Sequence, residues 1–197
     1  MDTCRQGNRN TTMTKVSENS DDDAERVERI ASNAEVHKNA WSETIDEMKA
    51  MAADLEDEGW DTFSVAAGHT APEGPDAGRE GRWGLVHVIP DNYAEAFEAY
   101  FERGDYPTYD VFRKEVQGRT FLLTVLSDPE TESAILLAGQ YQLMHAAPLV
   151  SKAKTEETVY THVQTLDETH RGSFEHEEPS KFFPNYERFE DRYTVRR

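Results

Sequence analysis

Three histidines on predicted strands are the side chains of this sequence best suited to bind a ligand. His87 lies in an apolar run over residues 83–89, His145 ends the run that begins at Ala134, and His162 lies in an alternating stretch over residues 158–166. Imidazole binds zinc and other divalent metals, and it changes its charge near neutral pH. If the three strands are neighbours, the side chains could meet in one pocket.

The alternative interpretation of these residues is structural. Histidines on strands commonly satisfy hydrogen bonds inside a sheet, and the glutamines and threonines of the late strands fit its solvent face. Two further histidines, His170 and His176, follow in a polar stretch and are expected to be exposed. The spacing matches no recognised metal site, so we predict no metal and no cofactor. The candidate ligand-binding residues are His87, Gln142, His145 and His162.

Signals for nucleophilic catalysis or phosphate binding are weak. The chain lacks a Gly-x-Ser-x-Gly motif, and its one cysteine, Cys4, precedes the predicted folded part. The glycine-rich segment 68–84 lacks Gly-Lys-Ser/Thr and precedes a strand, which favours a flexible loop. The sequence therefore favours a non-enzymatic binding or protein-interaction domain. The alternative is a small-molecule or metal-binding protein, or a small enzyme, that uses the strand histidines.

The net charge of the chain indicates the salt concentration to which it is adapted and the classes of partner that it can bind. Acidic residues number 39 against 21 basic ones, and the net charge is −18. Such a chain repels itself in ordinary salt, whereas at 1 M salt the Debye length falls to about 3 Å and screens the repulsion. We therefore predict a cytoplasmic protein adapted to high salt. Direct nucleic-acid binding is disfavoured because the basic residues are scattered among acids. No apolar run is long enough to predict a membrane span.

A long helix is predicted over residues 23–59, after a disordered polar tail over residues 1–22. Apolar residues recur along it every seven positions: Val27, Ala34, Trp41, Met48 and Leu55. Such a stripe packs a helix on a sheet or pairs two helices in a coiled coil. Ala34 and the polar pair His37-Lys38 weaken a coiled-coil seam, so packing on a sheet is favoured. A homodimer through residues 23–59 is the alternative.

The later segments predict the rest of one α+β domain over residues 23–184. Strand patterns fill residues 60–166, interrupted by a helix at 91–103, and residues 185–197 form a C-terminal tail. Few helices separate the late strands, which excludes a doubly wound parallel sheet. We expect a mostly antiparallel sheet of about five to six strands, with the long N-terminal helix and the second helix packed on one face.

Three stretches carry a resemblance to a group of proteins. They are Ile135–Leu143, Tyr160–Leu166 and Gly172–Pro179. They resemble segments of an uncharacterised protein family of halophilic archaea, over roughly residues 38–184. The resemblance implies a high-salt setting and a domain of unknown function, and it supplies no activity and no catalytic residue.

Overall fold

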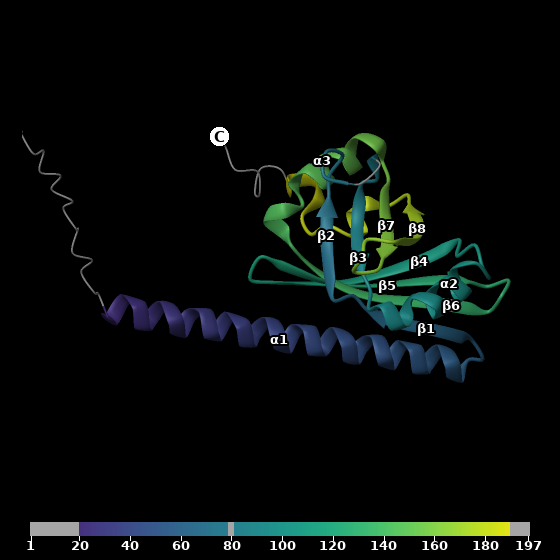
Figure 1. Ribbon diagram of the computed structural model, residues 1–197, viewed down its shortest axis with the longest axis horizontal. Coiled ribbons are helices and arrows are strands. Elements are labelled where there is room, and N and C mark those ends of the chain that lie inside the picture. The colour runs from purple at the N-terminus through teal and green to yellow at the C-terminus, as the bar shows by residue number, and fades with distance from the viewer. Residues whose placement is uncertain (1–19, 79–80, 190–197) are drawn as a thin grey trace, which may run out of the picture.

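The computed structural model describes residues 20–78 and 81–189 (Figure 1). Its α-helices are α1 (Ser20–Asp57), α2 (Ala94–Phe101) and α3 (Ala147–Glu156). Its strands are β1 (Asp61–Ala66), β2 (His69–Glu73), β3 (Gly84–Val88), β4 (Thr108–Val116), β5 (Arg119–Asp128), β6 (Ser133–Gln142), β7 (Val159–Gln164) and β8 (His170–His176). Short 3-10 helices are also present: η2 (Asp91–Tyr93) and η3 (Leu143–His145) between these elements, and η4 (Pro179–Lys181) and η5 (Tyr186–Arg188) after β8.

The strands form two four-stranded mixed sheets. Sheet A has the order β1-β6-β5-β4, and sheet B has the order β2-β3-β7-β8. One pair in each sheet is parallel, β1 with β6 and β3 with β7, and the other pairs are antiparallel. The α+β class is therefore confirmed. The prediction of a single, mostly antiparallel sheet of five to six strands is wrong.

Two strands of sheet B, β2 and β8, were not predicted from the sequence. β2 lies in the glycine- and proline-rich segment that was expected to be a loop, and its Pro72 is tolerated because β2 is an edge strand. β8 lies in the polar stretch after residue 167, and only three of its own residues, Gly172, Phe174 and His176, are buried. Each strand buries one face only, so neither produces the apolar run by which a core strand is recognised.

The C-terminal half of α1 packs on the outer face of sheet A. Ala40, Thr44, Met48 and Ala52 form its buried line at a spacing of four residues. Met48 and Ala52 pack against side chains of β5 and β6 that point away from sheet B, Leu123 and Leu136 among them. The favoured interpretation of the apolar stripe, a helix on a sheet, describes this half. The second helix does not share that face: α2 inserts Phe97 between Phe63 of β1 and Phe174 of β8.

The core between the two sheets is divided by a belt of polar positions. One apolar cluster contains Leu85, Leu122 and Tyr141, and a second contains Ile89, Leu126 and Leu137. At the inward position between the two clusters each central strand carries a polar residue or glycine, and all are buried: His87 on β3, Thr124 on β5, Gly139 on β6 and Thr161 on β7. Burying these groups is costly unless they are hydrogen-bonded, so the belt constrains how the two sheets fit together.

The ends of the domain differ from the predicted boundaries. The predicted tail over residues 1–22 lies outside the described part up to residue 19, and α1 begins at Ser20. Of the tail predicted over residues 185–197, η5 and the fully buried Phe189 belong to the folded domain, and residues 190–197 lie outside the described part. No helix in the described ranges is long and apolar enough to cross a membrane.

Candidate functional site

The structure separates the four predicted ligand-binding residues. His87 on β3 is fully buried between the sheets. His162 on β7 is the register partner of Val86, so its side chain points to the opposite face of sheet B. His145 is exposed in η3, and Gln142 is exposed at the end of β6. The three histidines therefore do not converge on one pocket, and no described group of three or more His, Cys, Asp and Glu side chains could hold a metal ion.

His87 is a neutral component of the polar belt. Its Nδ1 lies 3.2 Å from Oγ1 of Thr70, and its Nε2 has no hydrogen-bond partner among the described residues. The ring also packs directly over Gly139, where a Cβ atom would lie 2.5 Å from Cε1 of His87. Burial lowers the pKa of His87 to about 3, helped by the nearby His162 and His176. His87 therefore fits the alternative interpretation, in which a histidine on a strand has a structural role.

His176 is buried, contrary to the expectation that it is exposed. Only 1% of its surface is accessible, because it is the last inward-facing residue of β8. Its ring lies between Tyr109 and Phe182, with ring centroids 4.5 and 4.6 Å away, and its Nε2 lies 2.9 Å from Oγ1 of Thr161. Burial lowers the pKa of His176 to about 4, and the charge of Lys181 adds to the shift.

His162 lies in a second polar cluster, on the face of sheet B that points away from sheet A. Its Nδ1 is 2.7 Å from Oγ of Ser173, its register partner on β8, and its Nε2 is 3.0 Å from the carbonyl oxygen of Trp83. Ser173 Oγ is also 3.1 Å from Nε2 of His170. Burial lowers the pKa of His162, partly offset by its hydrogen bond to Trp83, so the imidazole is neutral near pH 7.

A cavity of about 290 Å³ opens in front of this cluster. It is lined by Gly81, Arg82, Trp83, Tyr160, His162 and Ser173. The ring of Tyr160 stacks on His162 with an interplanar angle of 8°, and it meets Trp83 edge-on. Of these residues, only His162 was predicted from the sequence to have a functional role. Ser173 and His162 are eleven residues apart with no motif between them, so only the register of β7 with β8 reveals the pair.

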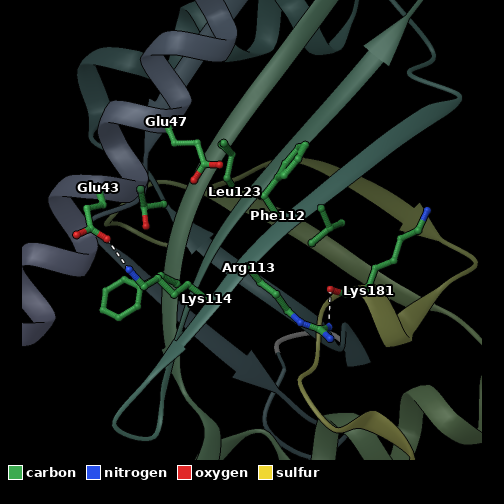
Figure 2. A pocket seen from close by; sticks show the side chains of 10 residues that line it. Glu43, Glu47, Phe112, Arg113, Lys114, Leu123 and Lys181 are labelled. Carbon is green, nitrogen blue, oxygen red and sulfur yellow. Dashed lines mark hydrogen bonds and ion pairs between the residues drawn. The ribbon is translucent and has the colours of Figure 1, made fainter.

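A groove of about 530 Å³ lies between α1 and the edge strand β4 (Figure 2). Glu43 and Glu47 point into it from the helix, and Phe112, which is 39% exposed, faces it from the strand. Lys114 closes one end through an ion pair with Glu43 at 2.5 Å. Both partners of this pair are more than half exposed, so the ion pair contributes little to stability. Other contacts in the groove can therefore replace it at little cost.

The N-terminal part of α1 extends past the sheets. Figure 1 shows the helix running well beyond sheet A. Near the point where it leaves the sheet lies His37, whose ring centroid is 6.2 Å from that of Phe121. Residues 32–36 are all exposed, Val36 included. We call residues 20–36 the free segment of α1. At 1.5 Å per residue it is about 25 Å long.

Comparison with known proteins assigns the chain to a family. A family of unknown function, DUF7529, matches residues 27–184, which is well over half of the 197 residues. The chain belongs to this family. The DUF7529 match begins inside the free segment of α1, so most of that segment, the groove and the His162 cluster are all parts of the family's domain. No curated protein and no solved structure matches the chain.

Proposed function

We propose that this protein is an interaction domain that pairs with a second copy of itself through the free segment of α1. The observation that carries the proposal is a 38-residue helix that packs on its own domain from His37 onward, whereas residues 32–36 are all exposed and the helix continues beyond them, past the sheets. Most of the stability of a protein helix comes from packing of its apolar face, not from helix propensity. A free segment that is part of the family's domain therefore calls for a partner surface.

The apolar pattern of the sequence supports a helical partner. The stripe that packs on sheet A continues without a break of register into the free segment as Val27, Ile30 and Ala34. Ala34 is exposed in the single chain. A second copy offers the same stripe, and a two-fold axis lets each copy cover the other. In this proposal the two interpretations of α1 hold for different parts of the helix: the free segment forms the coiled coil, and the rest packs on sheet A.

The charges of α1 favour an antiparallel pair. The first turn carries Asp21, Asp22 and Asp23, whereas Lys38 and Lys114 lie near the groove end of the free segment. When Ile30 of each copy packs against Ala34 of the other, residues 21–23 of one copy lie opposite residues 41–43 of the other, about one turn past Lys38 and beside Lys114, which forms an ion pair with Glu43. A parallel pair would instead set two acidic first turns side by side, which is unfavourable.

High salt is the proposed setting of this pairing. The supporting observation is the net charge of −18, which opposes the approach of two copies until salt screens it. The resemblance to proteins of halophilic archaea points the same way. Oligomeric state should therefore be measured in molar KCl.

Replacing Ile30 by Glu is expected to convert the dimer to a monomer. Full burial of an isoleucine side chain contributes about 1.5–3 kcal/mol, and the substitution acts once in each copy. The dissociation constant should rise at least about a hundredfold, since 1.4 kcal/mol is tenfold. Light scattering coupled to size exclusion should show twice the chain mass for the natural sequence and a single chain mass for Ile30→Glu.

Val36→Glu is the matched control for this substitution. Val36 lies on the same segment but off the stripe, and it is 37% exposed in the single chain. Val36→Glu should keep the dimer. A natural sequence that stays monomeric at high protein concentration in molar KCl would refute the proposed function.

A further inference from the structure

The hydrogen bonds around Ser173 fix which atoms carry protons. The carbonyl oxygen of Trp83 can only accept, so Nε2 of His162 carries the hydrogen in that 3.0 Å contact. In the neutral ring Nδ1 then has a free lone pair, and Ser173 donates its hydroxyl hydrogen to it at 2.7 Å. With its only hydrogen committed to His162, Ser173 Oγ accepts from Nε2 of His170.

This arrangement is that of a serine nucleophile with its base. Such pairs are recognised by a hydroxyl within hydrogen-bond reach of a base that a third group orients. Here the third group is the carbonyl of Trp83, which is also placed to stabilise the imidazolium that forms when His162 takes the proton. Burial keeps His162 unprotonated and therefore able to act as a base at neutral pH.

The cavity beside Ser173 suits a small ester. Trp83 and Tyr160 line the cavity together, in edge-to-face contact with each other, and the volume of about 290 Å³ limits the substrate to a small molecule. Arg82 lines the same cavity, and its charge acts on His162. A guanidinium at this position can bind the oxyanion that develops on a carbonyl oxygen under attack.

We propose that Ser173 is an activated nucleophile that transfers the acyl group of small carboxylic esters, with His162 as its base. Oγ of Ser173 attacks the ester carbonyl carbon while its proton passes to Nδ1 of His162. Collapse of the tetrahedral intermediate breaks the bond to the alcohol oxygen, which takes the proton from His162, and the acyl group stays on Ser173. A water molecule, deprotonated by His162, then attacks the acyl carbonyl carbon. The bond to Oγ of Ser173 breaks, Oγ takes the proton back from His162, and the carboxylic acid leaves.

This activity goes beyond the proposed pairing and does not depend on it. The cluster lies on the face of sheet B away from sheet A, whereas α1 packs on the outer face of sheet A. Ile30→Glu should therefore leave acyl transfer unchanged, and loss of Ser173 should leave the oligomeric state unchanged.

The test is covalent labelling of the full chain with a fluorophosphonate, together with hydrolysis of p-nitrophenyl acetate. We expect one phosphonyl adduct that peptide mass spectrometry maps to Ser173, and no adduct on Ser173→Ala. His162→Gln should slow both reactions by at least about a hundredfold, the usual contribution of a general base. The matched controls are Ser180→Ala and His145→Gln, an exposed serine and an exposed histidine outside the cavity, which should react as the natural sequence does.

Mapping the adduct on the natural sequence keeps the test valid even if a variant folds poorly. An adduct on another residue, or no adduct at all, would overturn the proposal. The proposal would also be overturned if the Ser173→Ala variant hydrolysed the ester as fast as the natural sequence, because the hydrolysis would then come from exposed imidazoles.

Discussion

Lowering the pH from about 7.5 to about 5 is expected to reduce the free energy of unfolding by roughly 4 kcal/mol. The main cause is the pair of fully buried neutral histidines, His87 with a pKa of about 3 and His176 with a pKa of about 4, and the lowered pKa of His162 acts in the same direction. In the unfolded chain both return to about 6.5 and take up protons as the pH falls. Between pH 6.5 and pH 4 the unfolded state thus binds more protons, so stability is complete above this window and is lost on acidification.

Measuring between pH 7.5 and pH 5 separates the titration of the histidines from that of the carboxylates. Asp61 and Asp167 have lowered pKa values, caused by hydrogen bonds from Tyr100 and Thr165 respectively, and they lose their contribution only at lower pH. Each histidine contributes roughly 2 kcal/mol at pH 5, which is large against a typical total of about 5–15 kcal/mol. Urea unfolding at the two pH values in molar KCl measures the loss.

His176→Phe is the variant that tests the assignment. A phenyl ring fits between Tyr109 and Phe182, where the imidazole lies now. The variant loses the hydrogen bond with Thr161, a cost that does not depend on pH, and it should lose only about half as much stability as the natural sequence between pH 7.5 and pH 5. Equal stability of the natural sequence at both pH values would contradict the buried neutral histidines.

Gly84→Ala is expected to lower stability by about 2–5 kcal/mol, combining backbone strain with overpacking. Gly84 has a φ of +151° at the start of β3, and a Cβ atom there would lie 2.3 Å from the carbonyl oxygen of Tyr160 on β7. The clash is with backbone, so it can be relieved only by separating two paired strands of sheet B. Thermal or urea unfolding reports the loss.

Gly118→Ala is the control for that clash. Gly118 also has a positive φ, +79°, but no atom lies within 4 Å of an added Cβ. Its substitution should cost only the backbone strain, about 1–2 kcal/mol. If the two alanine variants are equally stable, the close contact of β3 with β7 at Gly84 is not as described.

Elements with a strong apolar pattern could be predicted from the sequence. The heptad spacing from Val27 to Leu55 predicts α1 to within three residues at each end. The run Thr120–Leu126, apolar on both faces, predicts the central strand β5, which is covered by α1 on one face and by sheet B on the other. In both cases burial of a large apolar surface decides the structure, and that surface is visible in the residue types.

The second sheet and the Ser173 cluster depend on information that the sequence carries weakly. β8 buries only Gly172, Phe174 and His176, so its alternation is recognised only if a histidine and a glycine are accepted as core residues. The helix α3 carries Pro148 near its N-terminus, a helix-start signal in a segment that was predicted to belong to the sheet region 60–166. The pairing of Ser173 with His162 depends on strand register, which a bulge after Val163 shifts.

The most direct test of the proposed pairing is the distance between spin labels on two copies. In a Cys4→Ser background, labels at Asp21→Cys and, in a second sample, at Asn33→Cys are measured by pulsed dipolar spectroscopy in molar KCl. With the two-fold axis midway between Ile30 and Ala34, the rise of 1.5 Å per residue sets the two copies of position 21 about 33 Å apart along the helix, and the copies of position 33 about 3 Å apart. The antiparallel pair should therefore give a long distance for position 21 and a much shorter one for position 33. Absence of dipolar coupling at both positions would contradict self-association through α1, and short distances at both would contradict the antiparallel arrangement.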